Sequence, residues 1–194
     1  MAARRVSTLD KWFSKGSTSA SAVQASGTAP SAVAIQAAKM TPKQVLASEF
    51  ASKQKRRVVM DPDGNCFHRA WAMRLWGNAD LHQRARNLEE DFLRAHPDLF
   101  LKAIQKVYPG GRFPTSAAYA DHICTPRVWA SDFDARIMLA ATGLARATNH
   151  IVDERSGTIL NSYVVAEGDD PAGRTIDLIA LPRHYDLAVA QNIP

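Results

Sequence analysis

The chain has 194 residues, of which 46% are hydrophobic and 22% charged, a composition typical of a soluble globular protein with one ordinary domain. No apolar run approaches the roughly 20 residues that a membrane-spanning helix needs, and no continuous apolar segment marks a secretory signal. The two cysteines, Cys66 and Cys124, are too few for a disulfide scaffold and fit a reducing compartment such as cytoplasm or nucleus.

Positive charge is concentrated at the front of the chain. Residues 1–60 carry 10 Lys/Arg and 2 Asp/Glu, whereas residues 61–194 carry 14 and 17, which gives net charges of +8 and −3. The second part also lacks a stripe of alternating aromatic and basic residues. We therefore do not expect the folded body to bind nucleic acid.

Residues 1–40 are predicted to form a disordered basic tail and linker, and residues 41–194 the folded domain. The uncharged stretch 16–38 has too few large apolar groups to offset chain entropy. Within the tail, Leu9, Trp12 and Phe13 share one face of a helical turn and resemble a sliding-clamp-binding peptide, although Val6 stands where that motif opens with glutamine. An acid-poor, Arg-, Ser- and Ala-rich start also suits a transit peptide, so organelle targeting stays open.

Helical patterns dominate the first half of the predicted domain. Thr41-Pro42-Lys43-Gln44 has the residues of a capping box with proline at the first helical position, which predicts a helix start. A basic run then leads into a short strand or extended segment at Val58–Met60. Further helices are predicted at Cys66–Trp76 before Gly77, Leu81–Ala95, Asp98–Tyr108, Thr115–Ile123, and from a Ser131 cap to Thr142 before Gly143.

From His150 onward the pattern changes to strands. Three β-rich runs separated by turn residues lie at 151–152, 159–165 and 175–181. Helices first and strands later predict an α+β domain, with helices flanking a mostly antiparallel sheet.

The strongest chemical signal is a cysteine delivered to a helix start. Asp61-Pro62-Asp63-Gly64-Asn65 is dense in turn formers, and Cys66 opens the helix that follows. Unpaired N–H groups and partial positive charge at a helix N-terminus favour the nucleophilic thiolate. The N–H groups of Cys66 and of the 63–65 turn could bind an oxyanion, and Gly64 permits close approach of a substrate carbonyl.

A base and its orienting group are predicted near the end of the chain. His184 and Asp186 lie two residues apart, so on a strand both side chains point to the same side while Tyr185 packs behind them. Asp61 and Asp63 are the alternative partners for this histidine.

Other cysteine chemistry fits less well. A zinc site from Cys66, His68, His122 and Cys124 does not have the usual ligand spacing, and no C-x-x-C pair supports dithiol redox chemistry. Cys124 has no helix start or acid beside it, which indicates a structural role. No metal and no cofactor are expected.

Three blocks resemble the OTU (ovarian tumour) family of papain-like cysteine proteases. The first is Asp63-Gly64-Asn65-Cys66-Phe67-His68-Arg69-Ala70, the second is Trp129-Ala130-Ser131, and the third is His184-Tyr185-Asp186. They occur in the family's order and frame residues 45–194. The departures are Ala130 and Ser131 in place of two glycines, and His68 where an aromatic residue is common.

The resemblance implies an α/β sandwich fold and a thiol protease that hydrolyses isopeptide bonds of ubiquitin or polyubiquitin. Cys66 would be the nucleophile, His184 the base and Asp186 its orienter. Asp63 would shape an oxyanion loop with Gly64 and Asn65, and the segment of Trp129 would line the substrate groove. Such an enzyme would act in cytoplasm or nucleus, or in a host cell if the chain comes from a pathogen.

The arginine-bearing tail of ubiquitin predicts an acidic groove. Asp169 and Asp170, in the turn before the strand that leads to His184, are the first pair expected to bind it, and Asp132 and Asp134 the second. Two alternative functions stay open: an OTU-like module that binds ubiquitin with little or no cleavage, and an enzyme for another ubiquitin-like modifier.

Overall fold

The computed structural model describes residues 40–191, and the compact unit in this range begins at Thr41. The sliding-clamp motif of Leu9, Trp12 and Phe13 lies outside the described residues and stays a prediction, as does the disordered tail. None of the helices in the described range is long and apolar enough to cross a membrane.

A five-stranded sheet forms the centre of the fold, in the order β1-β5-β4-β2-β3. Three of its four strand pairs are antiparallel, and β2 and β4 are parallel. The strands are β1 (Lys55–Val58), β2 (Arg146–Val152), β3 (Ile159–Glu167), β4 (Thr175–Leu181) and β5 (His184–Ala190).

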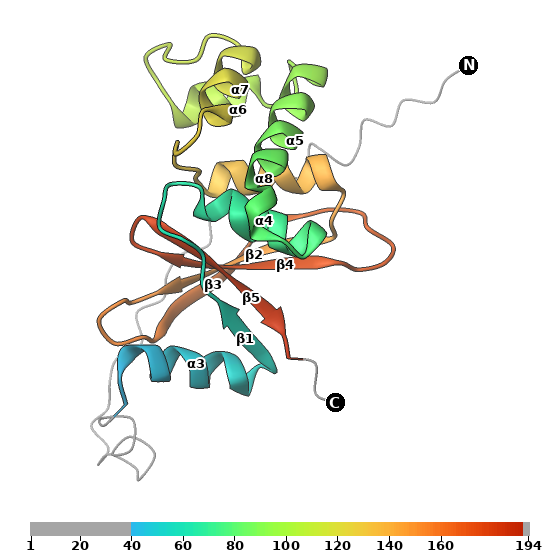
Figure 1. Ribbon diagram of the computed structural model, residues 1–194. Helices are drawn as coiled ribbons and strands as arrows, with labels where there is room; N and C mark the ends of the chain where they lie inside the picture. Colours follow the sequence, from blue (N-terminus) through green and yellow to red (C-terminus); the bar gives the residue numbers. More distant parts are fainter. Residues whose placement is uncertain (1–39, 192–194) are drawn as a thin grey trace, which may run out of the picture. The chain divides into compact units, whose positions relative to one another are not determined.

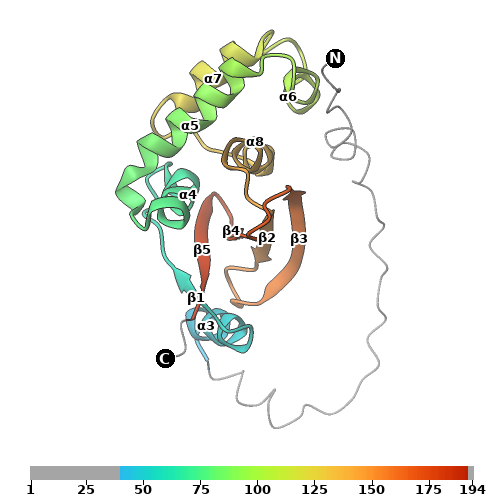
Figure 2. The ribbon, with the colours of Figure 1, turned by 90° about the vertical axis from the view of Figure 1, so that its right-hand side faces the viewer.

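Helices cover both faces of this sheet. Helix α3 lies on one face, α4 and α8 lie on the other, and α5, α6 and α7 form an outer group beyond α4 and α8 (Figures 1 and 2). The predicted α+β class, with helices flanking a mostly antiparallel sheet, is confirmed. The bounds are α3 (Pro42–Ser52), α4 (Cys66–Trp76), η1 (Ala79–Leu81), α5 (His82–Ala95), α6 (Leu101–Val107), α7 (Ser116–Cys124) and α8 (Asp132–Thr142).

The helix ends follow local sequence chemistry. Thr41 and Gln44 form the predicted capping box at the start of α3, and Ser131 caps α8 in the same way together with Asp134. Gly77 and Gly143 end α4 and α8 in the left-handed conformation, which glycine adopts at little cost.

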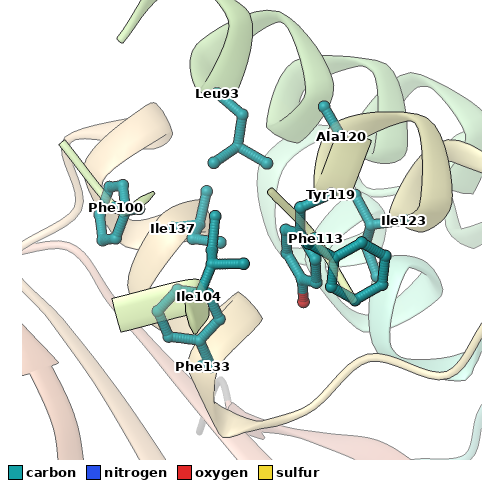
Figure 3. Packing of buried hydrophobic residues seen from close by; sticks show 9 residues of the cluster. All are labelled: Leu93, Phe100, Ile104, Phe113, Tyr119, Ala120, Ile123, Phe133 and Ile137. Carbon is teal, nitrogen blue, oxygen red and sulfur yellow. The ribbon is translucent and has the colours of Figure 1, made fainter. Parts of the chain in front are cut away.

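Two clusters of buried apolar side chains stand out among the described residues. The larger lies among α5, α6, α7 and α8, where the aromatic and aliphatic side chains labelled in Figure 3 point toward one another. The smaller lies between α3 and the sheet and comprises Leu46, Phe50, Val152, Ile179 and Ala188. Buried side chains of α4 and of the strands β4 and β5, among them Trp71, Leu178 and Leu187, join the helical layer to the sheet.

One local prediction needs correction, and one strand pairing was not foreseen. The strand expected at Val58–Met60 is instead β1, because the basic run pairs with β5 and its Lys55 and Arg57 bind acidic side chains. The parallel pairing of β2 with β4 was not predicted. It arises because β3 pairs with one side of β2 and the chain then crosses the start of β2 to place β4 on the other side.

Candidate active site

Cys66 is the first residue of α4 and follows the turn of residues 61–65, here called the Cys loop. The residue is only 2% exposed. The backbone N–H of Tyr185 in β5 donates to its Sγ at 3.4 Å, and the Phe67 ring packs edge-on against the Tyr185 ring at 5.4 Å between centroids. Chain segments far apart in sequence thus meet at the thiol.

His184 and Asp186 form a direct pair at the start of β5. Nε2 of His184 lies 2.8 Å from Oδ1 of Asp186. The other ring nitrogen, Nδ1, is buried and has no hydrogen-bond partner within residues 40–191. Because Nε2 is occupied by Asp186, Nδ1 is the nitrogen left to exchange a proton with the Cys66 thiol.

The environment of His184 favours its charged form. The hydrogen bond to Asp186, followed by the interaction with the Cys66 thiol, raises the pKa of His184 to about 9, against a smaller opposing effect of burial. An imidazolium beside a thiol favours the thiolate, which is the nucleophilic form of cysteine.

Asp186 is fully buried, and its carboxylate accepts hydrogen bonds from His184, Arg57 and Met60. Arg57 of β1 donates from Nε to Oδ2 at 2.6 Å and also forms an ion pair with it, and the Met60 N–H donates to Oδ1 at 2.7 Å. Burial alone would raise the pKa of Asp186, but the bonds from His184 and Met60 and the charge of Arg57 outweigh it and lower this pKa. Asp186 therefore stays ionised and fixes the imidazole orientation.

Asp63 folds the Cys loop and does not bind His184. Its carboxylate accepts from the Asn65 N–H and the Asn65 side chain, both at 2.9 Å, and from Arg69 at 2.9 Å. Burial would raise the pKa of Asp63, but the bonds to Arg69 and Asn65 lower it overall. Asp61 also faces Arg69, at 3.7 Å, so neither alternative partner takes the place of Asp186.

Of the N–H groups expected to bind an oxyanion, that of Asn65 is not available. The N–H of Asn65 is already used by Asp63, and the Asn65 side chain, 5% exposed, is turned into the protein. The N–H of Cys66, by contrast, meets no acceptor in the part of the chain that the structure describes. Cys66 is thus one backbone donor that this loop offers, and Asn65 has a structural role.

Gly64 packs directly against the backbone of Arg127. Its φ is +82°, and a Cβ at this position would lie 2.7 Å from the Arg127 carbonyl oxygen. Arg127 itself has a positive φ of 67°, and its N–H donates to the Asn65 side chain at 3.0 Å. The close contact joins the Cys loop to the segment before α8.

Replacing Gly64 by Ala is expected to lower both stability and activity. The left-handed backbone costs a non-glycine residue about 1–2 kcal/mol, and the contact with Arg127 adds to that cost and displaces the loop. Gly110→Ala is the matched control, because Gly110 has the same φ of +82° but open space around it. Urea unfolding and turnover measurements should show a larger loss for Gly64→Ala; equal losses would show that the contact with Arg127 has no effect.

An open pocket of about 410 Å³ adjoins the Cys loop. It is lined by Pro62, Asp63, Gly64, Arg127 and Trp129. Trp129 is 47% exposed, which is unusual for a large aromatic side chain and suits contact with a bound chain. The structure thus brings Trp129 beside the Cys loop.

The structure does not bring Asp169 and Asp170 to this site. Both residues precede Thr175, the first residue of β4, whereas Leu181, the last residue of β4, pairs with His184. The six residue steps from Thr175 to Leu181, or about 20 Å of strand, therefore separate the pair from the histidine. Asp170 also binds Arg174, at 2.7 Å. The strand that leads to His184 thus carries it away from Asp169 and Asp170, so their position does not favour substrate binding, and their substrate-binding role stays a prediction.

The second acidic pair is engaged inside the protein. Asp134 is fully buried and accepts from the Tyr119 hydroxyl at 2.5 Å. Asp132 accepts from the Tyr185 hydroxyl at 3.1 Å and from Asn149 at 2.5 Å. These carboxylates therefore support the helix start and Tyr185, and neither presents a free charge to an arginine of a substrate.

Cys124 differs from Cys66 in its position on a helix and in its neighbours. It lies at the end of α7, where its neighbours are Gln83 and Asn87. Burial, together with a bond to Glu90, raises the pKa of the Cys124 thiol to about 11. This thiol lacks a histidine partner and is expected to be unreactive.

Two arginines with contacts in this site have no evident role in the sequence pattern. Arg57 belongs to a basic run that suggests a solvated segment, and Arg86 lies in an amphipathic helix where a charge usually faces water. A signal for Arg86 exists in hindsight: Arg86 and Glu89 share the buried side of α5 with Ala85 and Leu93. Charges at core-facing positions indicate a buried polar network.

No protein-family model and no curated protein matches this sequence. Solved structures match at the level of fold. The OTU domain of OTUD1 is 19% identical, with a TM-score of 0.59 over 75% of this chain and 93% of that one. The viral OTU domain protease from Farallon virus is 16% identical, with a TM-score of 0.58 over 71% and 85%. The Hazara virus OTU bound to ubiquitin is 18% identical, with a TM-score of 0.58 over 71% and 82%. The chain therefore has the OTU-domain fold.

Proposed function

We propose that this protein is a cysteine deubiquitinase, which hydrolyses the isopeptide bond between the C-terminus of ubiquitin and a lysine side chain. The observation that carries the proposal is the meeting of Cys66, at the N-terminus of α4, with the His184–Asp186 pair of β5. The fold supports it, since one solved OTU domain of this fold is bound to ubiquitin. Ubiquitin or polyubiquitin is accordingly the proposed partner.

The first half of the reaction forms an acyl-enzyme. The Cys66 thiolate attacks the isopeptide carbonyl, and the N–H of Cys66 stabilises the oxyanion of the tetrahedral intermediate. When the intermediate collapses, the C–N bond breaks and the His184 imidazolium gives its proton to the departing lysine amine. The thioester on Cys66 and a neutral His184 remain.

The second half releases ubiquitin. Neutral His184 takes a proton from a water molecule as that water attacks the thioester carbonyl. Collapse of the second intermediate breaks the C–S bond, which frees the ubiquitin C-terminus as a carboxylic acid and restores the thiolate–imidazolium pair. The acid then gives its proton to solvent and leaves as the carboxylate. Asp186 stays ionised throughout and stabilises the charged imidazole.

Substrate is proposed to lie against the pocket beside the Cys loop. Trp129 offers exposed aromatic area there, and Arg127 offers backbone and side chain at the rim. Ubiquitin chains of any linkage have the same reacting carbonyl, so the catalytic residues do not distinguish among linkages.

A ubiquitin with a thiol-reactive group at its C-terminus tests nucleophile and substrate class together. We expect one covalent adduct on the wild type, an equal adduct on Cys124→Ala, and none on Cys66→Ala. Cys124 is the matched control because it is the second cysteine of the chain.

The same experiment separates the alternatives. Binding of ubiquitin without an adduct would instead identify a ubiquitin-binding module. An adduct with another ubiquitin-like modifier carrying the same group, and none with ubiquitin, would redirect the proposal to that modifier.

A further inference from the structure

Arg86 lies beneath the Cys loop as a fully buried cation. Its guanidinium donates to the Gly64 carbonyl at 3.1 Å and to the Asn65 side-chain oxygen at 3.0 Å. It also donates to the Ile123 carbonyl at 2.5 Å, at the end of α7, and to the Val128 carbonyl at 2.9 Å. One side chain of α5 thus joins the Cys loop, α7 and the segment before α8.

Oxygen acceptors surround the charge of Arg86 inside the helical layer. Asp134 is also fully buried nearby and favours the charged form of Arg86. Burial and then Asp134 raise the pKa of Glu89 well above its usual value, and burial lowers the pKa of His68, so the His68–Glu89 contact at 2.8 Å is neutral. Arg86 keeps its charge because a guanidinium does not lose its proton in proteins.

The hydrogen bonds from Arg86 determine where the side chain of Asn65 lies. Asn65 is the residue before α4, where asparagine ordinarily caps its own helix by accepting from the N–H of the second or third helical residue, here Phe67 or His68. Here it makes no such bond. Its oxygen is held by Arg86 and by the Arg127 N–H, and its amide donates to Asp63.

We propose that Arg86 is a positioning residue of the catalytic centre, which holds the Gly64 carbonyl and the Asn65 side chain away from the start of α4 and thereby keeps a competing acceptor away from the Cys66 N–H that binds the substrate oxyanion. The inference rests on the proposed function, because it concerns the oxyanion site of that reaction. Without the guanidinium, the Asn65 oxygen turns to cap α4 through the N–H of Phe67 or His68. It then lies beside the Cys66 N–H and disfavours an oxyanion there.

Two substitutions of Arg86 test this role. Arg86→Lys keeps the charge but not the planar fork that reaches four acceptors, and Arg86→Ala leaves a space of guanidinium size. Both are expected to lower kcat on a ubiquitin substrate about 10- to 100-fold with little change in KM, since an oxyanion contact acts in the transition state. Arg94→Ala is the control on the same helix, because Arg94 binds Glu90 and Asp121 at the surface.

Two reagents distinguish positioning from stability. Ubiquitin aldehyde forms an adduct whose oxygen occupies the oxyanion site, whereas iodoacetamide alkylates Cys66 without forming an oxyanion. We expect the Arg86 variants to bind the aldehyde more weakly while their alkylation rate changes little. Methylguanidinium, below concentrations that unfold the protein, should partly restore turnover in Arg86→Ala and leave Arg86→Lys unchanged.

The outcomes separate this inference from the proposed function. A wild type that does not react with ubiquitin aldehyde would overturn the proposed function. A reactive wild type together with a folded Arg86→Lys variant of normal kcat and normal aldehyde binding would overturn the role of Arg86 alone. If Arg86→Ala does not fold, Arg86→Lys alone is the test. Weaker binding of ubiquitin aldehyde at an unchanged rate of alkylation by iodoacetamide would support the role of Arg86, and unchanged binding would overturn it.

Discussion

Replacing His184 by Ala is expected to lower kcat/KM on a ubiquitin substrate by at least about 1,000-fold, because one side chain serves as acid, base and charge partner of the thiolate. The variant should also lose the fast reaction of Cys66 with iodoacetamide near neutral pH. That loss follows from the raised pKa of His184, which makes the imidazolium the resting form beside the thiol in the wild type. Steady-state kinetics and an alkylation time course measure the two effects separately.

His96→Ala is the matched control for this substitution. His96 is exposed, stacks on Phe92 at 4.4 Å and lies at the end of α5, away from the candidate site. It should leave both rates unchanged. A His184→Ala variant that is still rapidly alkylated and still cleaves ubiquitin would require another base, and the described structure gives the thiol no other histidine partner.

The candidate catalytic residues were accessible to prediction because their signals are local. A turn followed by a helix start places Cys66, and the alternation of a strand places His184 and Asp186 on one side. Helix bounds were predictable for the same reason, since caps such as Ser131 and stops such as Gly143 act within a few residues.

What the sequence does not reveal depends on strand register and on buried charge. The distance of Asp169 and Asp170 from His184 follows from the pairing of β4 with β2 and β5, which no local pattern encodes. The roles of Arg57 and Arg86 are hidden for a related reason. A basic residue in a strand or helix usually faces water, and only the tertiary contacts show that each of these two binds a buried acceptor.

Asp186→Asn is expected to lower activity less than His184→Ala and to change its pH dependence. Asn can still accept a hydrogen bond from the imidazole, but it lacks the charge that stabilises imidazolium. Because Asp186 is the largest cause of the raised pKa of His184, its neutralisation lets that pKa fall from about 9 toward the ordinary value of 6.5. The imidazolium, and with it the thiolate pair, is lost as pH rises through the pKa of His184. The alkaline limb of kcat/KM should therefore move to lower pH, and the loss of activity should be larger at pH 8 than at pH 6.

Asp177→Asn is the control that separates this effect from a general loss of stability. Asp177 resembles Asp186 in its contacts, since it binds a basic residue of β1, Lys55 at 2.9 Å, and faces a histidine, His150 at 3.4 Å. It has no contact with Cys66. Both variants lose an ion pair to β1, so both should unfold at lower urea concentration, but only Asp186→Asn should shift the alkaline limb. A shift of equal size in both variants would mean that the limb reports the stability of the sheet, and His184 would then have to be assigned a pKa by direct NMR titration.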